Sequence, residues 1–160
     1  MRGRVVIGGL TLAAAAVLTV GSCKDDVGLT SVPPPAERFV AFLSGANEPT
    51  PITTAAQGLA TLTIDGNLVS YRVELSNIDS AFLAHVHHGV AGVNGPVRVN
   101  LYIVPPRVPK GLDFSGLMVE DTITVPDSVL AFIRGGETYV NVHTKVNTGG
   151  EIRGQLFRFQ

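Results

Sequence analysis

The chain has 160 residues and is nearly neutral, with 12 lysines and arginines, 13 aspartates and glutamates, and a formal net charge of −1 at pH 7. Basic residues form no cluster, which argues against nucleic-acid binding. A single cysteine excludes an intrachain disulfide.

Residues 1–22 have the pattern of a secretory signal. Arg2 and Arg4 precede an uncharged, mostly apolar run over residues 5–20, and small residues lead up to Cys23. This junction resembles a bacterial lipobox, which implies cleavage before Cys23 and lipid on its thiol and new amino group. The alternative is a membrane-spanning anchor, because about 16 apolar residues approach the lower limit for a span. Either way we expect an extracytoplasmic chain, periplasmic or at the cell surface, held to a membrane of the cell envelope.

Residues 23–38 are predicted to be a tether. The segment mixes charge and serine with three consecutive prolines at positions 33–35 and shows no hydrophobic periodicity. Residues 39–160 then have the length of one domain. A domain without a disulfide must be stabilised by its core, or by its core and a metal.

Short runs of alternating apolar residues, separated by Gly, Pro, Asn and Asp, fill this domain and predict β-strands. The expected strands cover residues 39–43, 59–64, 68–75, 82–88, 97–104, 117–124, 139–144 and 151–159. Residues 124–136 predict one short helix instead, with Pro126 and Asp127 at its start and Gly135 at its end. Its expected buried stripe is Val129, Leu130, Phe132 and Ile133. We therefore predict an all-β domain: an antiparallel Greek-key sandwich or flattened barrel of about eight strands with one short helix.

All four histidines lie in two of the expected strands, at residues 84–89 (AHVHHG) and 139–144 (YVNVHT). Side chains alternate between the faces of a strand, so His85 and His87 share the face opposite Val86. By the same count His143 points outward from its own strand. If the two strands are neighbours, three imidazoles converge on one surface. His88 falls on the other face.

Three imidazoles suit Cu(II) or Zn(II) better than calcium or magnesium. Glu48 or Glu151 could add an oxygen ligand. The competing interpretation is structural: the rings could hydrogen-bond to backbone groups in the glycine-rich segments 89–95 and 147–150, and so hold these loops to the sheet. A third interpretation is an organic or peptide ligand. Glu151 and Arg153 alternate with Ile152 and are expected on the exposed face, in weak ion pairs.

Three blocks of the domain resemble the CHRD domain, the module repeated in chordin and found singly in many bacterial exported proteins. They are LSGANEP at residues 43–49 with AQGLA at 56–60, AHVHHGVAGVNGPV at 84–97, and YVNVHTKVNTGGEIRGQL at 139–156. The resemblance covers residues 39–157. The chain departs from the family pattern at Pro49-Thr50-Pro51 and at residues 104–110. The resemblance implies the fold and an extracellular setting, and it implies no catalytic activity.

A fainter resemblance links residues 75–78 and the following His85-Val86-His87 to the His-x-His strand of copper/zinc superoxide dismutases. The chain lacks the histidine-rich zinc loop of those enzymes and has no cysteine to spare. This resemblance therefore implies a single metal site at most.

These observations favour an exported, membrane-anchored, non-enzymatic binding or surface-interaction module, without catalytic residues. The first alternative is a single-site copper or zinc protein centred on His85, His87 and His143, with weak redox activity left open. The second is a passive structural module of the envelope. A binding module would present an exposed apolar patch, which we expect around Tyr102, Phe114 and residues 105–109.

Overall fold

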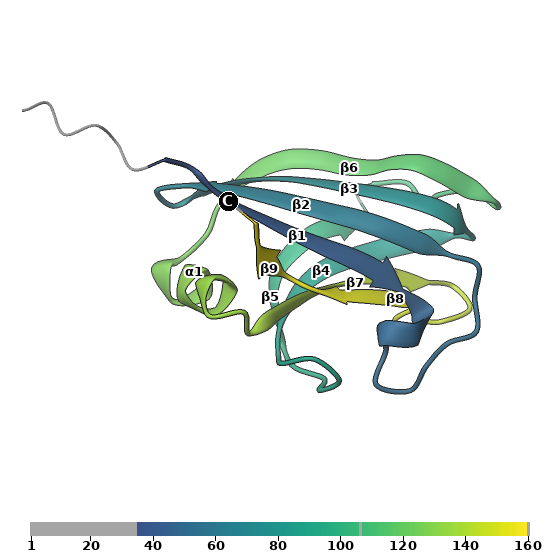
Figure 1. The fold of residues 1–160 in the computed structure, drawn as a ribbon. Helices are drawn as coiled ribbons and strands as arrows, with labels where there is room; N and C mark the ends of the chain where they lie inside the picture. Colours follow the sequence, from purple (N-terminus) through teal and green to yellow (C-terminus); the bar gives the residue numbers. More distant parts are fainter. Residues whose placement is uncertain (1–34, 106, 160) are drawn as a thin grey trace, which may run out of the picture. The chain divides into compact units, whose positions relative to one another are not determined.

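Nine antiparallel strands and one α-helix lie in residues 35–105 and 107–159, the part of the chain that the computed structural model describes (Figure 1). The expected signal segment, Cys23 and most of the tether lie outside these residues. The elements are β1 (Glu37–Ser44), a 3-10 turn η1 (Gly45–Asn47), β2 (Gln57–Asp65), β3 (Leu68–Ile78), β4 (Ala81–His88), β5 (Val97–Ile103), β6 (Phe114–Thr124), α1 (Asp127–Arg134), β7 (Thr138–Thr144), β8 (Ile152–Gln155) and β9 (Phe157–Arg158).

The strands follow the order β5-β4-β7-β8-β1-β2-β3-β6, and β9 pairs with β1. Figure 1 shows β1, β2, β3 and β6 as one layer, facing a second layer of β4, β5, β7 and β8. The layers join where Ser44 of β1 pairs with Arg153 of β8. The result is a nearly closed, barrel-like antiparallel sheet, which confirms the predicted all-β fold.

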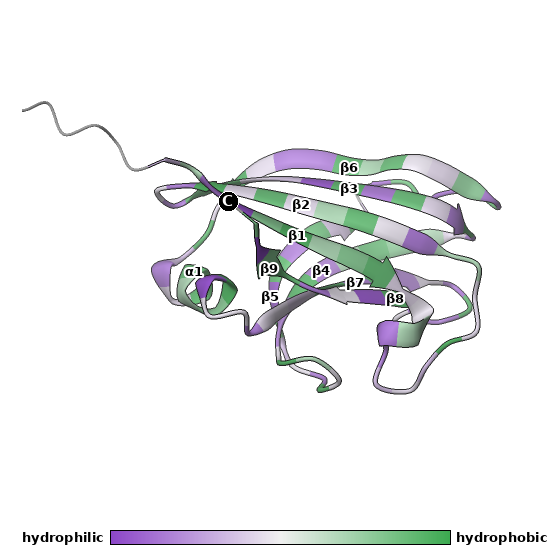
Figure 2. Cartoon of the chain, in the orientation of Figure 1, coloured by the Kyte–Doolittle hydropathy of each residue, from purple (hydrophilic) through white to green (hydrophobic). Residues whose placement is uncertain are grey.

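Alternating apolar side chains fill the space between the two layers. Strand β3 buries Val69, Tyr71, Val73 and Leu75, as its alternation predicts. Figure 2 shows the corresponding bands of hydrophilic and hydrophobic residues along the strands. In the second layer Val86 and Val140 are fully buried. Their neighbours in sequence, including the histidines, therefore point away from the core.

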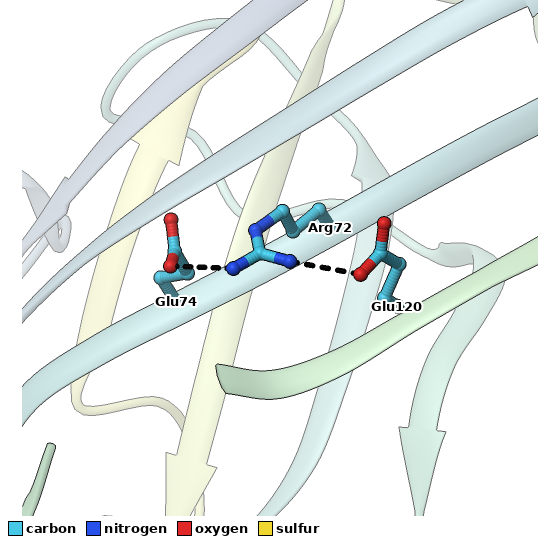
Figure 3. A network of polar contacts seen from close by, with 3 residues as sticks. All are labelled: Arg72, Glu74 and Glu120. Carbon is cyan, nitrogen blue, oxygen red and sulfur yellow. Dashed lines mark hydrogen bonds and ion pairs between the residues drawn. The ribbon is translucent and has the colours of Figure 1, made fainter. Parts of the chain in front are cut away.

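The outer face of the first layer carries charge. Arg72 lies between Glu74 and Glu120, with nitrogen–oxygen distances of 2.8 Å to each carboxylate (Figure 3). All three side chains are substantially exposed, and water screens exposed pairs of this kind. Arg72 is therefore a suitable control position for the experiments below.

Two details of the expected elements are wrong. The last predicted strand is divided: β8 pairs with β7, and after Leu156 the chain pairs with β1 instead, as β9. In α1, Val129, Leu130 and Ile133 are buried as expected, but Phe132 is only half-buried. Its ring stacks on the imidazole of His88, with ring centroids 3.8 Å apart.

No helix within the described residues is long and apolar enough to cross a membrane.

Candidate metal centre

Strands β4 and β7 are neighbours, and their register brings three histidines together. Leu83 pairs with His143, His85 with Asn141, and His87 with Tyr139. Because Val86 and Val140 occupy the core face, the imidazoles lie on the outer face of the second layer. His85 and His143 lie 58 residues apart in sequence. The sequence-based condition for a shared histidine cluster, lateral pairing of the two strands, is thus met.

The cluster of His85, His87 and His143 has the dimensions of a metal site. One nitrogen from each ring lies within 4.8 Å of the other two. The ring centroids are 5.0 Å apart for His85 and His143, 5.5 Å for His85 and His87, and 6.1 Å for His87 and His143. Copper or zinc bonds of about 2.0 Å require nitrogens about 3.3–3.6 Å apart. Small side-chain rotations would close the difference.

Hydrogen bonds fix the tautomer of two of the rings. The Nδ1 atom of His87 lies 2.9 Å from the carbonyl oxygen of Gly95, and that of His143 lies 2.9 Å from the carbonyl oxygen of Thr148. A carbonyl only accepts, so both Nδ1 atoms carry the hydrogen and both Nε2 atoms of the neutral rings have a lone pair. This arrangement is the one that metal-binding histidines use.

The Nε2 lone pair of His143 has a hydrogen-bond partner, whereas that of His87 has none among the described residues. His143 Nε2 lies 3.1 Å from Nδ1 of His85, which must therefore donate to it. The Nε2 atom of His87 is buried and has no hydrogen-bond partner among the described residues. A buried polar atom without a partner is uncommon and calls for an explanation. An ion bound by all three rings would give the Nε2 atom of His87 a partner. To free its Nδ1 atom for the ion, His85 would have to carry its hydrogen on Nε2 instead.

Burial keeps the three rings neutral. The histidines are 7–9% exposed. Desolvation, reinforced by His143 and His87, lowers the pKa of His85 from 6.5 to about 4. Desolvation also lowers the pKa of His87 and of His143, against the opposing effect of their backbone acceptors. Neutral imidazole is the form that binds metal, so the cluster is ready to coordinate at pH 7.

The same contacts hold two loops to the sheet, as the structural interpretation expects. Gly95 belongs to the loop between β4 and β5, and Thr148 to the loop between β7 and β8. These bonds use only the Nδ1 atoms of His87 and His143, which leaves the Nε2 atoms of both rings available for other contacts. The structural and the metal-binding interpretations are therefore compatible.

Neither glutamate suggested as an extra ligand belongs to the cluster of mutually close ligand atoms. Glu48 accepts a hydrogen bond from Asn141, and desolvation raises its pKa. Glu151 accepts from Thr54, Thr144 and Asn147. Glu151 is 7% exposed, so its expected place on an open face is wrong.

His88 lies apart from the cluster, as the alternation predicts. Its Nε2 atom is 3.2 Å from a carboxylate oxygen of Glu137. With its ring stacked on Phe132, His88 is a matched control for the three clustered histidines.

Sequence reasoning missed two residues beside the cluster. The Tyr139 ring stacks on His87 at 4.8 Å between centroids and 9° between planes. The guanidinium carbon of Arg153 lies 3.3 Å from the centroid of the same Tyr139 ring. Arg153 is 1% exposed, which corrects the expected surface ion pair. Tyr139 could have been found from the β4–β7 register, but no local pattern marks Arg153 as buried.

The two aromatic residues of the expected apolar patch are not exposed. Tyr102 is buried, and Lys110 and Arg107 lie over its ring. Phe114 is partly buried beside the core. Val108 and Leu112 remain exposed in this region.

Comparison with known proteins identifies the family. The sequence profile of the CHRD domain matches residues 39–156, which include both histidine strands and all three blocks noted above. Neither the curated proteins nor the solved structures contain a significant match. The chain therefore belongs to the CHRD domain family.

Proposed function

We propose that this CHRD domain is a non-enzymatic binding module of the cell envelope, and that its ligand is one copper or zinc ion held by His85, His87 and His143. The observation that carries the proposal is the buried, unpartnered Nε2 atom of His87, on a ring that has a nitrogen within 4.8 Å of one nitrogen on each of the other two rings. The nitrogen-only donor set favours a borderline transition metal over calcium or magnesium.

The backbone contacts of the cluster also support this proposal. Two of the three ligands already have their Nδ1 hydrogens bound to carbonyls of separate loops. Such outer contacts fix the ring orientation before the metal arrives. A passive structural module would not need three neutral imidazoles within one ion's reach.

The first prediction is that the purified full chain, without an affinity tag and in detergent, binds about one equivalent of Cu(II) or Zn(II). Replacing His87 or His143 with alanine should weaken binding at least about a hundredfold, because outer-contact residues alone are typically worth 10–100-fold. Competition with a chelator, followed by elemental analysis of the desalted protein, measures the affinity and the stoichiometry.

The matched control is His88→Ala, which removes an imidazole outside the cluster and should bind as the unaltered chain does. Equal binding by all of these variants would place any metal elsewhere. An unaltered chain that holds neither metal, and whose thermal stability neither metal changes, would contradict the proposal and leave the passive structural module as the better account.

The proposed membrane attachment rests on residues 1–23, where a basic start and an apolar run precede Cys23. We expect the mature chain to fractionate with membranes and to begin at a lipid-modified Cys23. Cys23→Ala should release it from that fraction or leave it unprocessed, because the acceptor thiol is lost. Mass spectrometry of the N-terminal peptide is the measurement. An unmodified Cys23 in membrane-bound protein would contradict lipid anchoring and favour the spanning anchor.

A further inference from the structure

We propose that Arg153 is a positioning residue for the metal centre, fixing the orientation of His87 through Tyr139 and through the loop at residues 89–96. This inference rests on the proposed metal-binding function. No hydrogen bond joins Arg153 to the three imidazoles. Apart from its charge, which after desolvation by burial contributes to the lowered pKa of His87, Arg153 would act on the site through the groups it holds.

The first connection is the loop. The Arg153 guanidinium donates to the carbonyl oxygens of Val90 at 3.0 Å and Val93 at 2.9 Å, and to the side-chain oxygen of Asn94 at 3.3 Å. The next residue in the loop is Gly95, whose carbonyl accepts the Nδ1 hydrogen of His87. The bonds to Arg153 thus hold the segment that places this acceptor, and the acceptor keeps the lone pair of His87 on Nε2.

The second connection is a stack of three planar groups. Arg153 and His87 both pack on the Tyr139 ring, and they come from β8 and β4, the two strands that flank β7 on opposite sides. The Tyr139 hydroxyl also accepts a hydrogen bond from the Gly95 amide. Tyr139 is therefore held from both sides and limits rotation of His87. A buried cation over an aromatic face is a favourable contact, and the planar guanidinium suits it better than an ammonium group does.

Both connections end at His87, whose Nε2 atom lacks a partner. A chain that only needed to hold the loop would gain nothing from leaving that atom buried and free. A fixed orientation of the His87 ring is useful when its lone pair has to bind a ligand that is not yet present.

The test compares full-length Arg153→Lys and Asn94→Ala with Arg72→Ala, which removes an arginine from the exposed network of Figure 3. We expect Arg153→Lys to lower Cu(II) or Zn(II) affinity about 10–100-fold, in the range of other outer-contact residues. Asn94→Ala removes one loop contact from an exposed side chain and should lower affinity a few-fold. Arg72→Ala should leave it unchanged.

A second readout uses metal-free protein. Nitrogen-15 NMR reports which nitrogen of His87 carries the hydrogen and how fast that hydrogen exchanges. We expect slow exchange at Nδ1 in the unaltered chain and in Arg72→Ala, and faster exchange in Arg153→Lys and Asn94→Ala.

The two readouts separate the proposals. If the unaltered chain binds no metal, the proposed function fails, while the NMR comparison still decides whether Arg153 orients His87. If the unaltered chain binds metal, and both the affinity and the His87 signal of folded Arg153→Lys and Asn94→Ala match those of Arg72→Ala, the positioning role is overturned. Should Arg153→Lys fail to fold, Asn94→Ala gives the same decision.

Discussion

Replacing Gly154 with alanine is expected to destabilise the domain by about 3 kcal/mol or more. Gly154 pairs with Val140 in the second layer, at the point where β8 passes β1 of the first layer. A Cβ atom there would press on the Phe42 carbonyl oxygen and approach a Leu43 methyl group to 2.9 Å. Glycine within a strand often marks such a close backbone approach.

The obstacle is backbone, so no side-chain rotation can relieve it. The strand β8 would have to move away from β1, opening the seam between the layers and displacing the neighbouring Arg153. Urea unfolding followed by circular dichroism measures the loss of stability.

Gly149→Ala is the matched control, because a Cβ atom at Gly149 would meet nothing within 4 Å. Its free energy of unfolding should stay within about 0.5 kcal/mol of the unaltered chain, as for a typical surface substitution. Equal midpoints for the two variants would show that the seam is not closely packed.

The metal-free domain is expected to lose stability as the pH falls from 6.5 to 4. His85 titrates at about 4 in the folded protein instead of 6.5. Between these values the unfolded chain binds a proton that the folded chain does not, so protonation favours unfolding. The contribution of a neutral His85 is therefore complete above pH 6.5 and is lost below about pH 4.

A shift of this size corresponds to roughly 3 kcal/mol. The lowered pKa values of His87 and His143 act in the same direction, whereas the raised pKa of Glu48 acts in the opposite one. Urea unfolding at a series of pH values, compared between the unaltered chain and His85→Gln, isolates the effect of His85.

The variant should show a shallower decline, since the carboxylates are common to both proteins. Parallel pH profiles would contradict the prediction. Direct titration of the His85 ring by NMR gives an independent value for its pKa.

Strand alternation was sufficient to predict the faces of the second layer. Counting by two from Val86 and Val140 placed His85, His87 and His143 on one surface, and the β4–β7 register confirms that they lie together. Alternation also predicted the buried residues of β3. Both predictions succeed because a strand with one face in the core leaves little freedom for the other face.

The same count failed to predict burial on the outer face. Arg153 does point away from the core, but a loop covers it. The carbonyls that accept from Arg153 lie at Val90 and Val93, 60 or more residues away in sequence. Local patterns report which face a side chain occupies and say nothing of a distant loop that folds over it.

The adjacency of β4 and β7 also sets when the histidine cluster can exist. His85 and His87 lie near the middle of the chain, but His143 and Arg153 come from its last quarter. A polypeptide that ends before residue 143 has only two of the three imidazoles, those of His85 and His87. If the proposed site binds an ion through all three rings, capture must await the final strands, and loading would belong to the finished fold and not to the growing chain.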